Sequence, residues 1–304
     1  MQRWILTLAM ACSPATIDQP APGKTEADTG TSDTADTDDT DTTDTGEPDD
    51  TDELAWPGDE WDEAEPEAHG FDSDLLDEAR EYAFVSTHNT QAVVIIKDGV
   101  LIAEWYADDT DRDTPVTSWS TAKSFTSALF GVALREKLLE LDEPIGDYMP
   151  DWSGETHQGI TIRHLLEMRS GIEENTANEY GMYGEAYQLA YSLDRTPSWE
   201  PGVSFNYVNE DSMVLGGVLS AAFDREVGRV AQDEIFEPLG MEAAWWTDSS
   251  GHSLTWCCID STARDFARFG LLYARDGEWM GEQLIPSDFV AESTAGISYY
   301  GYYG

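Results

Sequence analysis

Apolar residues recur at helix-like and strand-like spacing through most of the chain after residue 70. Asp72 and Ser73 can cap a helix that the apolar spacing extends to about Phe84. The side chains expected to face inward on this helix are those of Leu75, Leu76, Ala79 and Tyr82 or Ala83. Two apolar runs then flank the turn Lys97-Asp98-Gly99 in QAVVIIKDGVLIAEWYA and predict a β-hairpin.

Helical periodicity returns further along the chain, at about 121–139, 161–170, 208–223, 225–236 and 261–275. We expect Gly171 to end the second of these helices in the left-handed conformation. The last helix should start after Asp260-Ser261 and end before Asp276-Gly277. Strands, a mainly helical middle and a return towards strand-like sequence together indicate an α+β fold with a helical insertion.

The first twelve residues differ in kind from the rest. Arg3 precedes a short apolar stretch, and small residues lead into Cys12, as in an export signal. Ending on Ala11-Cys12, this segment resembles a bacterial lipoprotein signal, although Ala9 stands where such signals most often carry Leu. In such signals the cysteine is lipidated and becomes the new N-terminus. A plain secretory signal and a buried N-terminal segment are the alternatives.

Residues 13–70 are expected to form a disordered acidic linker. The run TGTSDTADTDDTDTTDTGEPDDTDE has almost no apolar residues, so folding could not offset the entropy of ordering. Beside a lipidated Cys12 it would tether a domain to a bacterial membrane, in the periplasm or at the cell surface. Specific calcium binding is not expected from this pattern, since the Asp-Thr alternation lacks the glycine-turn loop of a calcium site.

The amino-acid composition limits the kinds of partner that this protein can bind. The formal net charge is −45, from 61 Asp and Glu against 16 Lys and Arg, which excludes nucleic acid as a natural partner. No apolar run approaches the length of a membrane-spanning helix, so only a lipid anchor would attach the protein to a membrane. Residues 71–304 hold 41 of the acids and 14 of the bases and read as an acidic but ordinary globular domain.

The first chemical candidate is the pair Ser120 and Lys123 in VTSWSTAKSFTSALFGVAL. The three-residue spacing places hydroxyl and amine one turn apart on one helical face. A serine hydroxyl becomes a good nucleophile when a nearby base takes its proton, and free N–H groups at the helix start favour developing negative charge. Taken alone, the pair fits an N-capping serine and a surface lysine better.

The second candidate is the pair Tyr207 and Asn209 in PGVSFNYVNEDSMVLGGVL, just before a helix. Near the Lys123 ammonium a phenolate would be stabilised, and the tyrosine could act as a base. Asn209 offers a donor and an acceptor, for a substrate amide or for orienting Lys123. The alternative is a packed tyrosine and an asparagine that caps the helix.

Other catalytic patterns are weak or absent in the sequence. His164 in ITIRHLLEMRSGI precedes two leucines and is expected to be a structural hydrogen bonder. There is no G-x-S-x-G elbow, no H-E-x-x-H zinc motif and no apparent Ser-His-Asp arrangement. Cys257 and Cys258 are neighbours, and Cα atoms ~3.8 Å apart lie below the usual disulfide range. We therefore expect two partly buried thiols.

The order of these pieces carries more information than any one of them. SWSTAKSFTSALFGVAL, LDEPIGDYMPDW, ITIRHLLEMRSGI, PGVSFNYVNEDSMVLGG and STARDFARFGLLYARDGEWMGEQLIPSDFV follow one another. This series resembles the serine beta-lactamase and penicillin-binding protein superfamily. The most similar branch is the class C beta-lactamase-like hydrolases, which includes esterases and 6-aminohexanoate-dimer hydrolases. The resemblance covers roughly residues 75–304, within an expected catalytic domain of 71–304.

The resemblance implies an antiparallel sheet flanked by helices, beside a mainly helical domain, with the site between them. It implies that Ser120 is the acylated nucleophile and that Lys123 helps to remove its proton. Tyr207 would serve as base and then as acid to the leaving group, and Asn209 would hold the substrate amide and Lys123. The Ser120 backbone N–H would be one oxyanion donor. The family uses no metal or organic cofactor, and the substrate would be a small ester, amide or peptide.

The chain departs from the family pattern in two ways. The third motif, Lys-Thr-Gly or His-x-Gly on a late strand, is not found after SYYGYYG, so the final strands and a closing helix are expected to be missing. Tyr207-Val208-Asn209 stands where class A beta-lactamases carry Ser-Asp-Asn, and no deacylating Glu is found, so efficient penicillin hydrolysis is not expected. A tethered serine hydrolase and a catalytically inactive or surface-displayed binding domain are the two hypotheses.

Overall fold

The structure, a computed structural model, describes residues 5–7, 55–173 and 181–296. All of the architecture below belongs to the unit formed by residues 1–11 and 55–304. Cys12 and the acidic run that follows it lie outside the described residues. None of the described helices is long and apolar enough to cross a membrane.

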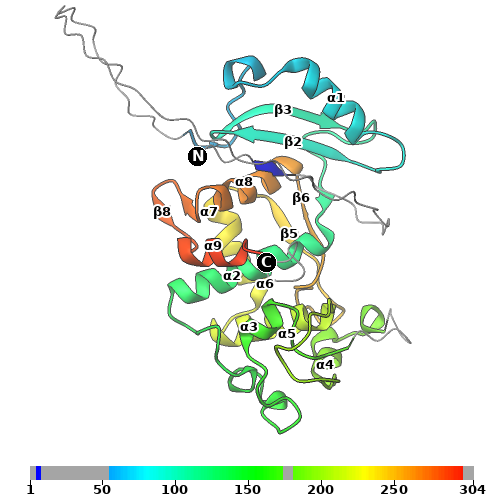
Figure 1. The fold of residues 1–304 in the computed structure, drawn as a ribbon, viewed down its shortest axis with the longest axis vertical. Helices are drawn as coiled ribbons and strands as arrows, with labels where there is room; N and C mark the ends of the chain where they lie inside the picture. The colour runs from blue at the N-terminus through cyan, green and yellow to red at the C-terminus, as the bar shows by residue number, and fades with distance from the viewer. Residues whose placement is uncertain (1–4, 8–54, 174–180, 297–304) are drawn as a thin grey trace, which may run out of the picture. The chain divides into compact units, whose positions relative to one another are not determined.

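Helices surround two small antiparallel sheets, which confirms the expected α+β class (Figure 1). The first sheet has the order β1-β2-β3, with bounds Ile5–Thr7, Ala92–Lys97 and Val100–Tyr106. The predicted hairpin forms β2 and β3, and Asp98 and Gly99 between them both have positive φ, 55° and 90°. Two such residues in a two-residue loop match the right-handed twist of the flanking strands.

The second sheet has the order β4-β6-β5, and a two-stranded hairpin pairs β7 with β8. The periodicity did not predict these short strands, which are Val116–Thr117, Ile259–Ser261, Ala243–Trp245, Glu278–Trp279 and Glu282–Gln283. Strand β4 leads directly into the turn that carries Ser120, while β6 follows Cys258. The second sheet therefore brings two distant segments to the same edge of the candidate site.

The core is built around helices α2, Ala122–Arg135, and α5, Asn209–Ala222, both buried along most of their length. Phe125 of α2 stacks on Phe269 of α8, Ala263–Ala274, with ring centroids 3.7 Å apart. The remaining α-helices are α1 Ser73–Ala83, α3 Ile162–Leu166, α4 Gln188–Leu193, α6 Val227–Ala231, α7 Glu237–Leu239 and α9 Ser287–Ser293. A π-helical turn spans Gln232–Phe236, and 3-10 turns span Pro66–His69, Trp119–Thr121, Ile145–Asp147, Pro150–Trp152 and Met182–Gly184.

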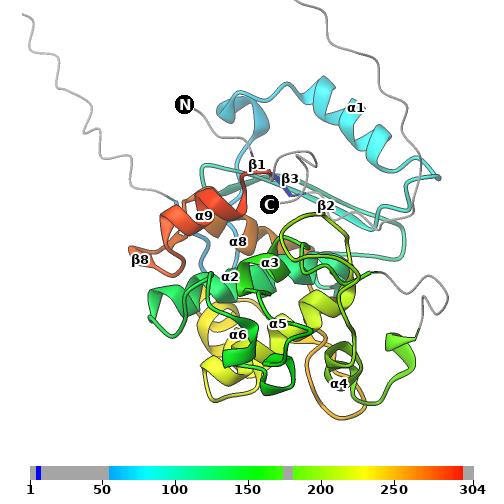
Figure 2. The same ribbon diagram turned by 60° about the horizontal axis from the view of Figure 1, so that its bottom comes forward.

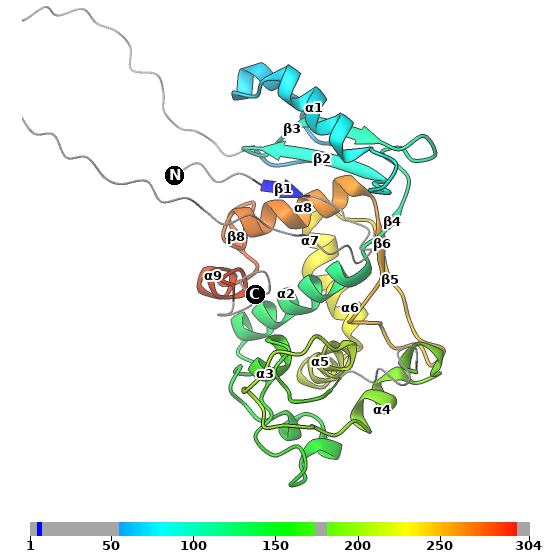
Figure 3. The same cartoon turned by 45° about the vertical axis from the view of Figure 1, so that its right-hand side comes forward.

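The layers are seen best from the side. Helix α1 lies on one face of the first sheet and α8 on the other (Figure 3). Figure 2 shows α9 near α2 and α8, where Phe289 and Ile285 pack into the core. Helices α3, α4 and α5 gather on the far side of α2 from that sheet (Figure 1). The mainly helical second region expected from the sequence is this group.

The predicted helices are present, but several of their ends differ. Helix α3 ends at Leu166, because Met168 takes the left-handed conformation (φ 54°) before Gly171 does. The helix expected at 225–236 is α6, the π-helical turn and α7 in succession. Thr262, not Ser261, caps α8 by accepting from the Asp265 N–H.

Helix α1 is capped as expected, since Asp72 accepts from the N–H groups of Asp74 and Leu75. Its expected inward face is only partly correct. Leu76 and Ala83 pack against the apolar outer face of the first sheet. The other expected inward residues, Leu75, Ala79 and Tyr82, are exposed. One narrow stripe of α1 therefore covers the sheet, and the helix contributes no fully buried residue.

The packed domain begins earlier than residue 71. Residues 55–70 lie against it, with Trp61 only 5% exposed and its indole N–H donating to the Arg264 carbonyl at 3.3 Å. The Arg275 guanidinium lies 3.8 Å from the centroid of the Trp56 ring. The prediction of a disordered linker over 13–70 is thus wrong for residues 55–70. These two aromatic residues supply apolar surface for packing, although the segment is acidic on average.

Three arginines of α8 and its C-terminal end hold this early segment. Arg264 makes paired hydrogen bonds to Glu104, at 2.7 and 2.8 Å, and a further bond to Glu60 at 2.9 Å. Arg268 donates to the carbonyls of Gly58 and Asp59, and Arg275 to that of Ala55. The acidic start of the domain is therefore fixed by guanidinium groups from one helix.

Replacing Trp61 by Ala tests where the folded domain begins. We expect Trp61→Ala to lower the free energy of unfolding by about 3–5 kcal/mol, the usual cost of removing a buried aromatic side chain. Leu75→Ala, at a side chain 62% exposed, should change it by less than ~0.5 kcal/mol. Urea titration followed by tryptophan fluorescence measures both. Equal stabilities would place the start of the domain after residue 70.

Candidate active site

Ser120 lies in the 3-10 turn that leads into α2. The turn is anchored to β6, because Ser118 N–H donates to the Ile259 carbonyl at 2.8 Å and Ser118 Oγ accepts from the Ile259 N–H at 2.9 Å. Trp119, between Ser118 and Ser120, has a left-handed backbone, with φ 48°. Such a conformation is uncommon for a residue other than glycine and persists where neighbouring contacts impose it.

Lys123 follows one turn later and is buried, with 9% of its surface exposed. Its Nζ atom lies 3.3 Å from Ser120 Oγ, 2.8 Å from Asn209 Oδ1 and 2.7 Å from the Trp256 carbonyl oxygen. An ammonium group has three donors, and this geometry supplies three acceptors. The alternative of a surface lysine is therefore wrong.

Burial lowers the pKa of the Lys123 amine to about 7, because the charged form loses its hydration. Near neutral pH a substantial fraction of this amine is therefore unprotonated and has a lone pair. Of its three partners, only Ser120 Oγ can give a proton to that lone pair, since the Asn209 and Trp256 oxygens accept only. The arrangement is suited to general-base activation of Ser120.

Tyr207 and Asn209 reach the same place from the start of α5. Lys123 Nζ lies 4.8 Å from the centroid of the Tyr207 ring, and the tyrosine is 39% exposed. Asn209 Nδ2 donates to Tyr183 Oη at 3.1 Å, so its amide links Lys123 to the 3-10 turn that holds Tyr183. The structure thus brings together the four residues proposed from the sequence.

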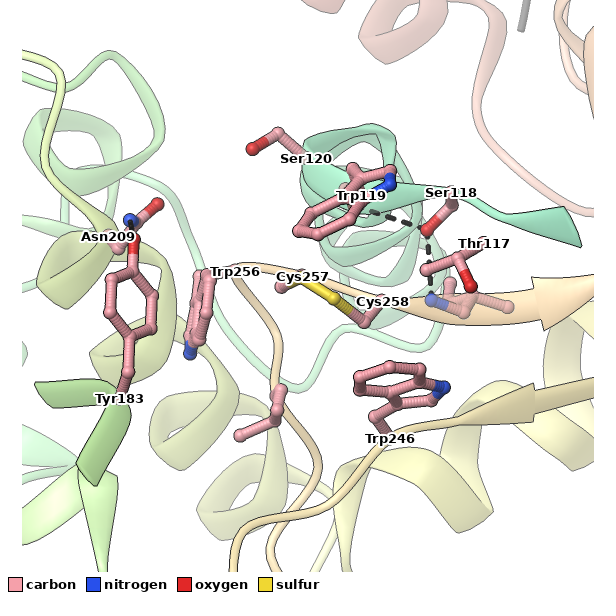
Figure 4. The surroundings of a disulfide bond; sticks show 12 residues. Thr117, Ser118, Trp119, Ser120, Tyr183, Asn209, Trp246, Trp256, Cys257 and Cys258 are labelled. Carbon is pink, nitrogen blue, oxygen red and sulfur yellow. Dashed lines mark hydrogen bonds between the residues drawn. A yellow bond between two sulfur atoms is a disulfide. The ribbon is translucent and has the colours of Figure 1, made fainter. Parts of the chain in front are cut away.

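A cavity of about 810 Å³ opens beside Ser120. Figure 4 shows Trp119, Trp246 and Trp256 around it, with Ser120 at one side and Tyr183 and Asn209 at the other. Trp119 and Trp246 are 59% and 47% exposed, so two large rings present their surface to this space. Apolar walls with a few polar groups are typical of pockets for small molecules.

The loop from Leu254 to Cys258 was missed by the sequence analysis. Its most direct contribution is the Trp256 carbonyl that accepts from Lys123, a backbone group that no motif marks. The loop also joins Cys257 and Cys258 in a disulfide, so the expectation of two thiols is wrong. Cys258 has φ 68°, an uncommon backbone conformation that accompanies the pairing of neighbouring side chains.

His164 lies outside this cluster. Its backbone N–H donates to Thr161 Oγ1 at 3.3 Å, and its Nδ1 accepts from the Thr161 N–H at 3.2 Å. This reciprocal pair caps α3, and burial lowers the pKa of the imidazole. In the described part of the chain, no group of three or more His, Cys, Asp or Glu residues could hold a metal ion. The SYYGYYG stretch lies outside the described residues.

A family model described as Beta-lactamase matches residues 85–294. A 6-aminohexanoate-dimer hydrolase from Paenarthrobacter ureafaciens is 20% identical over 69% of this chain and 58% of its own. A D-aminopeptidase from Gluconobacter oxydans is 27% identical over 50% and 31%, and a beta-lactamase from Escherichia coli K12 is 24% identical over 46% and 39%. The chain thus matches about a third to three-fifths of the length of these relatives.

Solved structures share the fold. A penicillin-binding protein homologue from Pyrococcus abyssi, an octamer, superposes with a TM-score of 0.61 at 19% identity, over 76% of this chain and 64% of that one. A D-stereospecific amidohydrolase from Streptomyces gives a TM-score of 0.52 at 20% identity, over 64% and 70%. At these identities the likeness concerns the arrangement of helices and strands.

The lowered pKa of Lys123 predicts a pH-dependent contribution to stability. From pH ~7 to ~10.4 the unfolded chain holds a proton that the folded chain has lost, so the free energy of unfolding rises with pH. Relative to Lys123→Met, stability should rise by about 1 kcal/mol per pH unit above pH ~7. Urea titrations of both proteins from about pH 6 to about pH 9 measure this difference.

Below pH ~7 Lys123 is protonated in both the folded and the unfolded chain. The difference in the free energy of unfolding between the parent protein and Lys123→Met should therefore not change with pH there. A difference that stays flat across the whole range would show that the buried amine keeps its proton in the folded protein.

Proposed function

Because this chain belongs to the beta-lactamase family, we propose that it is a serine hydrolase that cleaves an ester or amide bond through an acyl-Ser120 intermediate. The observation that carries the proposal is the buried Lys123 amine, 3.3 Å from Ser120 Oγ and with its pKa lowered to about 7. An amine in this state can accept the serine proton at neutral pH.

In the proposed first half-reaction, Ser120 Oγ attacks the carbonyl carbon of the substrate while its proton passes to the neutral Lys123 amine. Negative charge develops on the carbonyl oxygen, where the Ser120 backbone N–H would be one donor. Collapse of the tetrahedral intermediate breaks the bond to the leaving group, which takes a proton from Tyr207. The products of this half-reaction are the acyl-enzyme and the free alcohol or amine.

In the second half-reaction, water attacks the acyl carbon. Tyr207 takes the water proton, and Ser120 recovers its own proton as the carboxylic acid is released. Asn209 has a double part in this proposal. Its oxygen holds Lys123 at 2.8 Å, and its amide lies at the cavity wall, where it can meet a substrate amide.

The relatives and the cavity support the proposed substrate class. Two relatives are named for amide or peptide substrates, the 6-aminohexanoate-dimer hydrolase and the D-aminopeptidase. A cavity of about 810 Å³ suits a small ester, amide or short peptide. We therefore place small acyl compounds of these kinds ahead of beta-lactams, since Tyr207-Val208-Asn209 differs from the class A pattern.

Treatment with a fluorophosphonate probe tests the nucleophile. We expect one covalent adduct by intact mass in the parent protein and none in Ser120→Ala. Lys123→Met, which removes the base but keeps the apolar stem, should react about 10²–10⁴ times more slowly. Circular dichroism of all three proteins controls for folding. A well-folded parent protein without an adduct would identify a catalytically inactive member of the family.

We also propose that Cys12 is lipidated and that the acidic stretch after it tethers the domain to a bacterial membrane. The supporting features are the Arg3 start, the short apolar stretch and the Ala11-Cys12 site. We expect the full chain expressed in bacteria to sediment with membranes. The Cys12→Ser variant should either appear in the soluble fraction or keep its uncleaved N-terminal segment. An uncleaved, unlipidated parent chain by intact mass would favour instead an N-terminal segment that stays in the protein, where β1 pairs with β2 in the first sheet.

A further inference from the structure

We infer that the Cys257–Cys258 disulfide is a positioning element of the active site: it holds the backbone that orients Lys123 and Ser120, and opening it disables Ser120 without unfolding the protein. This inference rests on the proposed function and extends it. It is carried by backbone contacts of the loop that contains the disulfide.

The loop is fixed on one side to α2. The Trp256 carbonyl accepts from Lys123 Nζ at 2.7 Å, and the neighbouring Thr255 carbonyl accepts from Thr126 Oγ1 at 2.8 Å. Two successive peptide carbonyls therefore contact two side chains on one turn of the helix. A shift of this loop would move the acceptor that sets the position of the Lys123 amine.

On its other side the loop is fixed to α5. Thr255 Oγ1 donates to the Ser212 carbonyl at 2.7 Å. Gly216 leaves room for this threonine, because a Cβ at that position would lie 2.5 Å from Thr255 Oγ1. The front of the loop is thus wedged between the two central helices. Further along, the Cys257 N–H donates to the Leu254 carbonyl at 2.8 Å, and the Cys258 carbonyl accepts from the Trp246 N–H at 2.9 Å.

The disulfide adds a covalent restraint to this hydrogen-bonded part of the loop. Cys258 N–H donates to the Trp119 carbonyl at 3.1 Å, directly before Ser120 in the sequence. Both partners of this bond have left-handed backbones, φ 68° at Cys258 and φ 48° at Trp119. Residues with side chains rarely adopt this conformation unless surrounding structure imposes it. A bond between neighbouring cysteines closes a small ring through one peptide unit and removes the rotations by which Cys258 would leave this conformation.

The same disulfide forms part of the wall of the Ser120 cavity, between Trp119, Trp246 and Trp256 in Figure 4. Both cysteines are almost fully buried, at 2% and 3% exposure. A small reductant would therefore reach the sulfur atoms through the cavity that receives the substrate. A substrate bound in this cavity would therefore block the path of the reductant to the disulfide.

The opening step is thiol–disulfide exchange with a small dithiol. One dithiol thiolate attacks a cysteine sulfur and forms a mixed disulfide, releasing the other cysteine as a thiolate that takes up a proton. The second dithiol thiolate then displaces the remaining cysteine, which is protonated in turn. The dithiol becomes a cyclic disulfide, and its two electrons reduce the protein disulfide to two thiols.

Opening the ring lets Cys258 relax towards ordinary backbone angles and frees the carbonyls of Trp119 and Trp256 to move. Water then reaches the Lys123 amine, whose low pKa is caused by burial. The pKa should rise towards the ordinary lysine value, so less neutral amine is present at pH ~7. The pH at which Ser120 becomes reactive should shift upwards.

The experiment uses the full chain with Cys12→Ser, so that Cys257 and Cys258 are the only cysteines. Alkylation under denaturing conditions, followed by intact mass, should find no thiols before dithiol treatment and two after it. The rate of fluorophosphonate labelling is then measured against pH in the oxidised, reduced and reoxidised protein. Tryptophan fluorescence and circular dichroism report on the fold in each state.

We expect reduction to slow labelling at pH ~7 by on the order of 10²-fold, to raise the midpoint of the pH profile and to leave the circular dichroism unchanged. Reoxidation should restore the rate and the midpoint. Cys257→Ser/Cys258→Ser should behave like the reduced protein and be insensitive to dithiol. A merely structural disulfide would change stability but not the midpoint.

Three results would overturn the inference. Two alkylated thiols before reduction would show that the disulfide does not form. Equal rates and midpoints in the oxidised and reduced proteins would show that it does not position the site, while the serine hydrolase proposal would stand. Oxidised protein that takes up no probe at any pH would remove both proposals together.

Discussion

The arrangement of the candidate site depends on keeping one amine away from water. Lys123 is buried where the 3-10 turn before α2, the start of α5 and the loop before β6 meet, and each of these three segments supplies one acceptor within 3.3 Å of its Nζ. A buried cation without such partners would be strongly unfavourable. The three segments must therefore meet at this point, and their meeting is what holds Ser120, Asn209 and the Trp256 peptide in one small volume.

Much of this site could be predicted from the sequence because its key spacing is local. The spacing of three from Ser120 to Lys123 places both on one helical face, and Tyr207 and Asn209 lie at the start of another helix. What brings the two pairs together is tertiary packing of α2 on α5. That contact could be anticipated through resemblance to a family, whereas periodicity alone predicted the helices without their arrangement.

The parts that were missed have physical reasons. The Trp256 carbonyl is a backbone group, and every residue has one, so no residue type marks it. The disulfide was excluded on ordinary distances between neighbouring Cα atoms, whereas the left-handed backbone at Cys258 is a property of the folded loop. Average composition places residues 55–70 in the linker, because it hides the two tryptophans, Trp56 and Trp61, that pack there. Leu75 and Tyr82 show the opposite error, because they were expected to be buried and are exposed. An apolar side chain on a helix is buried only where another surface packs against it.

The arginines along α8 have a mechanical consequence. Any pull applied through the chain that precedes Ala55 is first met by guanidinium contacts from Arg264, Arg268 and Arg275, all on or next to one helix. Arg264 passes that force to β3 through its paired bonds to Glu104. Strand β3 and the start of α8 would take up the strain before α2 and α5 do. The segments that hold Lys123 would therefore keep their spacing until these arginine contacts are lost.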